Sequence, residues 1–166
     1  HGCCHNPCGA DLSLSQWEVI ANMAEQQGFI PFVDIAYQGL GDGLEQDAAG
    51  LRTLVARLPE VLVAASCSKN LGLYRERTGA IIFLCQDKTN ADALVSQALV
   101  AARRVYSMPP AHGGLLAGRV LADEKLNASW RSELMTMCQR INGLRTDLAT
   151  RLNKTGKGDF SFIERE

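Results

Sequence analysis

Apolar and polar residues follow two spacings that alternate along the chain. Nearly continuous apolar runs of strand length are typical of strands buried on both faces of a sheet. These runs occupy residues 29–37, 61–66 and 79–85. Between them, apolar residues recur every three or four positions, as on one face of a helix, in segments 11–28, 47–58 and 87–105. The alternation predicts an α/β fold with a buried sheet.

The first helical segment carries signals for both of its ends. Ser13 or Ser15 can cap its N-terminus. Gln16 or Glu18 can complete a capping box, and Gly28 can end the helix. We therefore expect one helix with defined ends within residues 11–28.

The pattern changes after residue 111. Residues 127–152 carry a single apolar stripe at helical spacing. A helix of about 26 residues spans roughly 40 Å, which predicts a connection from one domain to another. Residues 154–166 are expected to start a strand. We therefore divide the chain into residues 1–111, which hold the sheet, and residues 112–166, which hold connecting helices and the start of a second domain.

The composition excludes several classes of protein. A formal net charge of −1 over 166 residues leaves no basic surface for nucleic acid or anionic lipid. Every apolar run is too short to cross a bilayer, so no membrane association is expected, and no signal peptide is recognised. Six cysteines without secretory features indicate reduced thiols, so we expect a cytoplasmic protein.

The opening HGCCHNPCG places cysteines beside histidines, which raises the question of zinc. Adjacent Cys3 and Cys4 would point to opposite faces of a strand, and no paired cysteines follow with the spacing of a structural zinc site. We expect buried thiols and no metal ligands. A metal-binding module built on these cysteines and histidines is an alternative.

Polar side chains capable of chemistry follow two of the predicted strands. Asp34 and Tyr37 lie at the end of the first strand. Ser66, Ser68 and Lys69 follow the second. Ligands of open α/β sheets bind beyond strand ends, where these side chains would converge. A lysine directly after an apolar run is either solvated there or held in a cleft for its chemistry.

Taken together, these residue types match the requirements of pyridoxal phosphate. This cofactor needs a lysine for its Schiff base and a carboxylate at its ring nitrogen. Its phosphate needs hydroxyl groups and a guanidinium, which Arg77 can supply. Singly, each residue has an ordinary interpretation, such as a loop carboxylate or a surface ion pair. The set as a whole favours the cofactor.

Four stretches of the chain resemble the motifs of a known family, in that family's order and at similar spacing. They are HGCCHNPCGADLS, PFVDIAYQGLGDGL, SCSKNLGLYRERTG and YSMPPAHG. With them, nearly the whole chain resembles the class I, fold-type I pyridoxal-phosphate-dependent aminotransferases of the aspartate and aromatic-amino-acid group. The resemblance implies an α/β/α sheet from part of the large, cofactor-binding domain over residues 1–111. It implies a long interdomain helix and the start of the small domain over residues 112–166.

The resemblance also implies roles at the cofactor ring. Lys69 forms the Schiff base with pyridoxal phosphate and moves a proton between substrate and cofactor. Asp34 pairs with the ring nitrogen and is supported by His1. Tyr37 and Asn6 bind the 3-oxygen of the ring.

Further implied roles concern the phosphate and the substrate. The phosphate is held by Ser66, Ser68 and Arg77. Asn6, whose bond to Pro7 is cis in the family, also contacts the substrate carboxylate. Arg103, with Arg104 as the alternative, reaches the neighbouring subunit's site and pairs with the side chain of a dicarboxylate substrate.

The implied activity is transfer of an amino group from aspartate or an aromatic amino acid to 2-oxoglutarate by a homodimer, and the preference between these donors stays open. Cys8 and Met108 replace residues that are common in the family. The family's N-terminal half and its arginine for the substrate α-carboxylate are not among these residues. We therefore expect an internal fragment that is catalytically incomplete alone. A catalytically inactive paralogue is an alternative.

Overall fold

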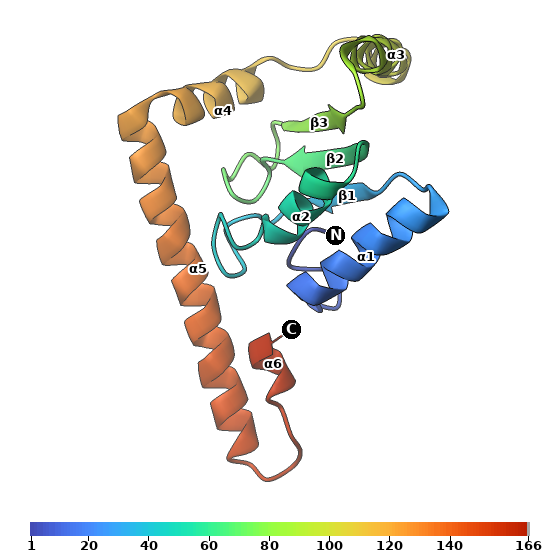
Figure 1. Ribbon diagram of the computed structural model, residues 1–166. Coiled ribbons are helices and arrows are strands. Elements are labelled where there is room, and N and C mark those ends of the chain that lie inside the picture. Colours follow the sequence, from blue (N-terminus) through green and yellow to red (C-terminus); the bar gives the residue numbers. More distant parts are fainter. Residues whose placement is uncertain (166) are drawn as a thin grey trace.

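The computed structural model describes residues 1–165 and contains a three-stranded mixed sheet. The strands stand in the order β1 (Phe32–Ile35), β2 (Val61–Ser66) and β3 (Gly79–Leu84) (Figure 1). β1 is parallel to β2, and β3 is antiparallel to β2. The carboxyl ends of β1 and β2 therefore lie at the same edge of the sheet.

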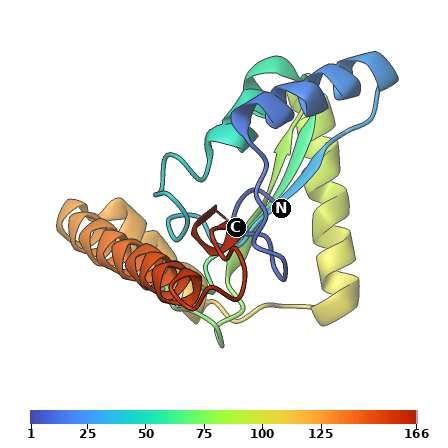
Figure 2. The same cartoon turned by 90° about the horizontal axis from the view of Figure 1, so that it is seen from below.

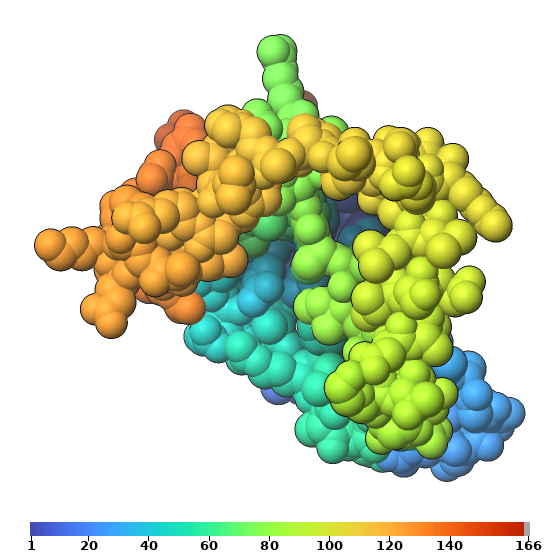
Figure 3. Space-filling model, turned by 90° about the horizontal axis from the view of Figure 1, so that it is seen from above, coloured from blue at the N-terminus to red at the C-terminus, as the bar shows by residue number. Residues whose placement is uncertain are grey.

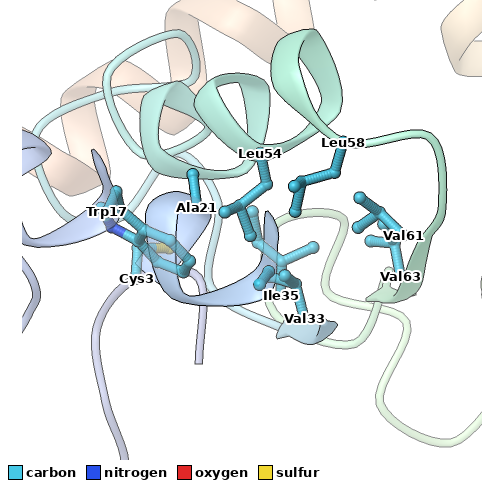
Figure 4. Close-up of a cluster of buried hydrophobic side chains, with 10 residues drawn as sticks. Cys3, Trp17, Ala21, Val33, Ile35, Leu54, Leu58, Val61 and Val63 are labelled. Carbon is cyan, nitrogen blue, oxygen red and sulfur yellow. The ribbon is translucent and has the colours of Figure 1, made fainter. Parts of the chain in front are cut away.

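Two helices, α1 (Leu14–Gln27) and α2 (Ala49–Arg57), pack together against one face of the sheet (Figure 2). Figure 4 shows the core between them and the strands, in which Leu54 and Val61 are fully buried. At the rim, Arg57 of α2 pairs with Glu18 and Glu25 of α1. This core fixes β1 and β2, the strands that precede the predicted site.

Helix α1 has the ends that its sequence predicts. Ser13 Oγ accepts a hydrogen bond from Gln16 N, and Gln16 Oε1 accepts one from Ser13 N at 2.8 Å. Gly28 ends the helix in the left-handed conformation, at φ 71°. The capping box is therefore the Ser13–Gln16 pair.

The remaining helices contribute no residue to this core cluster. They are α3 (Lys88–Tyr106), α4 (His112–Ala122), α5 (Glu124–Asn153) and α6 (Phe162–Arg165). Figure 3 shows α3, α4 and the segment between them arching over a hollow above the sheet. Asp123 separates α4 from α5, because its carboxylate accepts hydrogen bonds from Lys125 N and Leu126 N and caps α5. The predicted long helix is confirmed as α5, with 30 residues.

Three expectations about burial and strand formation are wrong for residues 1–165. β1 alternates exposed and buried residues, since the face that carries Phe32 and Asp34 is not covered by the described chain. β3 is exposed over its first four residues, because neither face of this stretch is covered within residues 1–165. Residues 162–165 form the short helix α6 in place of a strand. The predicted boundary at residue 111 coincides with the N-cap of α4 and stays a prediction.

Candidate functional site

The parallel pairing of β1 with β2 brings Lys69 and Tyr37 together. Asp34 lies opposite Ala64 in the register, so the chain leaves both strands at the same level. Tyr37 follows the end of β1, and Lys69 follows the end of β2. Lys69 Nζ lies over the Tyr37 ring, 4.8 Å from its centroid. An ammonium group at this position is stabilised by the electron-rich face of the ring.

Asn6 joins this pair from the opening loop. Its side-chain amide donates a hydrogen bond to the Tyr37 hydroxyl at 3.4 Å. The Asn6–Pro7 peptide bond is cis. The amine, the phenol and the amide of three distant segments therefore meet at one place.

Asp34 and His1 form a second contact. His1 Nε2 lies 3.9 Å from Asp34 Oδ2, and the Asp34 side chain is about half exposed. The opening loop is fixed to β1 because Gly2 N donates to the Asp34 carbonyl at 2.7 Å. His1 therefore stands beside the carboxylate that it is predicted to support.

Ser66, Ser68 and Arg77 also lie together, at the junction of β2 and β3. Arg77 Nη1 donates to Ser68 Oγ at 3.4 Å and to the Tyr74 carbonyl at 3.0 Å. Ser68 is buried, and its backbone N–H donates to Ser66 Oγ at 3.1 Å. Two hydroxyl groups beside one guanidinium complement a phosphate group.

A cavity of about 740 Å³ opens beside Lys69. Asn6, Tyr37 and Lys69 line it, together with Asn142 and Arg145 from α5. The volume falls in the range of about 300–1,000 Å³ found for small-molecule sites. The Asp34 side chain and the Ser66, Ser68 and Arg77 cluster lie outside this lining.

Arg103 and Arg104 are not brought to the cavity by the described part of the chain. Both lie exposed in the last turn of α3, a helix with no buried residue among those described. The other two histidines have structural partners: His5 Nδ1 lies 2.9 Å from Cys8 Sγ, and His112 Nδ1 lies 3.1 Å from Glu76 Oε2.

Asp47 organises the loop after Tyr37 and was missed in the sequence. Its buried carboxylate accepts hydrogen bonds from the backbone N–H groups of Gly39, Gly41 and Asp42, at 2.7, 3.0 and 2.7 Å. An acid that follows a glycine-rich loop is the signal that was available. These three amide donors hold the carboxylate in place and so fix the conformation of the loop.

Cys3 and Cys4 lie closer together than the sequence predicts. Their sulfur atoms and an oxygen of Asp47 lie within 4.8 Å of one another, because Cys4 has a positive φ of 49° and the segment is not a strand. The neighbouring Cys3 side chain lowers the pKa of Cys4. The neighbouring Cys4 side chain and burial raise the pKa of Cys3. The Asp47 oxygens are already engaged by three amides, so the cluster is poorly suited to a metal.

A protein-family model described as aminotransferase class I and II matches residues 1–166. The chain is 47% identical over 164 residues to the aromatic-amino-acid aminotransferase of Paracoccus denitrificans, covering 98% of this chain and 42% of that protein. It is 45% identical over 164 residues to the aspartate aminotransferase of Escherichia coli K12, and the match covers 98% of this chain and 41% of that protein. The chain therefore spans about two-fifths of the length of these relatives.

Solved structures show the same relationship. An aromatic amino acid aminotransferase with 3-indolebutyric acid superposes with a TM-score of 0.96 at 46% identity, over all of this chain and 42% of that one. The aromatic-amino-acid aminotransferase of Burkholderia pseudomallei, covalently bound to pyridoxal phosphate, superposes with a TM-score of 0.96 at 42% identity. This match also covers all of this chain and 42% of that one. These similarities confirm the predicted fold class.

Proposed function

Because the chain belongs to the family of class I and II aminotransferases, we propose that it is part of a pyridoxal-phosphate-dependent enzyme. The proposed reaction moves an amino group from aspartate or an aromatic amino acid to 2-oxoglutarate. The observation that carries the proposal is the placement of Lys69 over Tyr37, with Asn6 bonded to the same phenol, at the wall of a cavity. Relatives named for both substrate classes support the choice of donors.

The residues present fit pyridoxal phosphate by the chemistry of their side chains. Lys69 supplies the amine, and Tyr37 and Asn6 supply neutral polar groups beside it. Arg77 and Ser68 supply a cation and a hydroxyl group for a phosphate. Asp34, with His1 beside it, supplies a carboxylate for a protonated ring nitrogen. These residues would hold the cofactor.

When bound, pyridoxal phosphate supplies an electron sink that stabilises negative charge at the α-carbon of the substrate. Lys69 Nζ is the group that takes up and returns the proton of that carbon, since it is the amine in the cavity lining. Its position over the Tyr37 ring restricts where the amine can move. The lysine therefore serves as the proton carrier.

Asn6 and Tyr37 orient the reacting groups. The hydrogen bond from Asn6 leaves the Tyr37 O–H free to donate toward the cavity, because the hydroxyl oxygen is the acceptor. Tyr37 can then donate to an oxygen on the cofactor ring without bringing a charge. Asn6 lies in the cavity lining, and its proposed role there is to bind a substrate carboxylate.

We extend the proposal to the assembly and its location. The full-length protein is proposed to be a homodimer in which Arg103 binds the side-chain carboxylate of a dicarboxylate substrate across the subunit boundary. The exposure of Arg103 at the end of α3 is compatible with that role. All six cysteines are free, which supports a reducing, cytoplasmic location. Within residues 1–165, no helix combines the length and hydrophobicity needed to cross a membrane.

The experiment uses the full-length protein loaded with pyridoxal phosphate. We expect amino transfer from aspartate to 2-oxoglutarate, and a loss of about 10²-fold or more in kcat for Lys69→Ala, the loss typical of removing a general acid–base group. Lys88→Ala is the matched control, because Lys88 is an exposed lysine that pairs with Asp92 on α3. Equal activity of the two variants would refute the proposal.

A further inference from the structure

We propose that Asn70 is a positioning residue that ties the Lys69 turn both to the Tyr37 loop and to the long helix α5. This inference rests on the proposed function, because it assigns Asn70 a task in setting the geometry of Lys69. It goes further because it connects the Lys69 turn with α5. The connection is made by Trp130, which lies sixty positions after Asn70 in the sequence.

The first contact joins the two loops that carry the reacting side chains. Asn70 Nδ2 donates to the Gln38 carbonyl at 3.2 Å. Asn70 directly follows Lys69, and Gln38 directly follows Tyr37. One side-chain amide therefore fixes the backbone beside the amine to the backbone beside the phenol.

The second contact joins the Lys69 turn to α5. Trp130 Nε1 donates to the Asn70 carbonyl at 2.7 Å. The indole is partly buried, so water competes for this hydrogen bond less than it does for one at the surface. The main chain and the side chain of Asn70 thus hold two different parts of the fold at the same residue.

Helix α5 also holds the Tyr37 loop directly. Cys138 Sγ and Asn142 Nδ2 both donate to the Gly41 carbonyl, at 3.1 and 2.8 Å. α5 therefore contacts the loop after β1 through Gly41 and the turn after β2 through Asn70. A shift of α5 changes the position of both.

The orientation of the Asn70 amide is determined by its partner. A carbonyl accepts only from the NH₂ group, so Nδ2 must face Gln38. Asn70 Oδ1 is then buried and accepts no hydrogen bond within residues 1–165. The side chain of Asn70 therefore acts through its donation to the Gln38 carbonyl.

The test compares Asn70→Ala and Trp130→Phe in the full-length protein loaded with pyridoxal phosphate. Asn22→Ala is the control, because Asn22 accepts a hydrogen bond from Arg57 between α1 and α2, away from the cavity. Losing one hydrogen bond that positions Lys69 should lower kcat roughly fivefold in each variant, with KM within about twofold of wild type. The pH midpoint of the visible absorbance of the bound cofactor should also shift, because the surroundings of Lys69 change.

The double variant shows whether the two contacts act as one connection. We expect its loss in kcat to be smaller than the product of the single losses, because both contacts hold the same residue. A change in fold stability alone would leave the absorbance midpoint in place. Fivefold losses in kcat with unchanged absorbance midpoints would therefore overturn the proposal. It would also be overturned if kcat and the midpoint of Asn70→Ala and Trp130→Phe equalled those of Asn22→Ala.

Failure of the proposed function would look different. In that case the wild-type protein would show no visible absorbance that depends on Lys69, and the role of Asn70 would fall with it. If Lys69 is required but both Asn70→Ala and Trp130→Phe behave like the control, only the positioning role is overturned. Should Asn70→Ala not fold, Trp130→Phe decides, because it leaves the Asn70 side chain in place.

Discussion

Lys69 Nζ lies 4.8 Å from the centroid of the Tyr37 ring, although the strands that precede these two residues are separated in the sequence by α2. The contact exists because β1 and β2 are parallel and end at the same edge of the sheet. Tyr37 offers its ring face to the amine and its hydroxyl oxygen to Asn6. The two parts of the tyrosine therefore have separate tasks, which substitutions can distinguish.

Tyr37→Phe keeps the ring and removes the hydroxyl group. In the full-length protein loaded with pyridoxal phosphate, we expect the pH midpoint of the visible absorbance to rise, because a neutral donor to the cofactor ring is lost. One hydrogen bond predicts a shift of about one pH unit, or ~1.4 kcal/mol. Tyr37→Leu removes the ring face that contacts Lys69 as well as the hydroxyl group. An unchanged midpoint in Tyr37→Phe would contradict the assigned hydroxyl role.

Asp34→Asn removes the charge beside His1 and leaves the side-chain shape. We expect the full-length protein to release pyridoxal phosphate more easily, with a dissociation constant about 10- to 100-fold higher, since a charge-assisted hydrogen bond to the ring nitrogen is lost. Equilibrium dialysis with absorbance detection measures this. Asp92→Asn on the surface of α3 is the control and should bind like wild type. Equal affinities of the two variants would refute the assignment of Asp34.

The thiols of Cys4 and Cys138 should differ in the pH at which they react with iodoacetamide. The pKa of Cys4 is lowered, so its thiolate is populated at lower pH than that of an ordinary cysteine. Burial raises the pKa of Cys138, so its thiolate requires a higher pH. In a pH series followed by peptide mapping, labelling of Cys4 should rise at lower pH than labelling of Cys138. The reverse order would contradict the lowered pKa of Cys4.

Leu54→Ala should destabilise the protein strongly, because Leu54 is fully buried between α2 and the sheet. Removing its side chain leaves a cavity and costs about 2–5 kcal/mol of the free energy of unfolding. Val55 is the next residue on α2 and is 42% exposed, so Val55→Ala should cost much less. Urea unfolding of both variants provides the comparison. Similar midpoints would contradict the assignment of the core.

The alternation of helices and strands over residues 11–105 was predictable from local spacing, and so were the ends of α1. The exposure of β1 and β3 could not be predicted. An apolar run indicates that a strand can pack against other apolar groups, but it does not indicate whether such a partner is present. Phe32 and Ile81 are 64% and 56% exposed in the described chain. The end of the chain was misassigned because the apolar residues of 160–163 suit a strand or a short helix equally.

The residues at the candidate site were found in the sequence through motifs, while the residues that hold them in place were not. Lys69, Tyr37 and Asn6 belong to recognisable stretches, and the structure brings them together. Asn70 and Trp130 are joined across sixty positions by a single hydrogen bond, and no local pattern reports such a contact.

The central claim is that Lys69 is the residue that binds pyridoxal phosphate covalently. The most direct measurement is borohydride reduction of the full-length protein loaded with the cofactor, followed by peptide mass mapping. We predict a pyridoxyl phosphate group on the peptide that contains Lys69, and its loss in Lys69→Ala. A label on another lysine with Lys69 unmodified, or no label in a protein that transfers amino groups, would contradict the account.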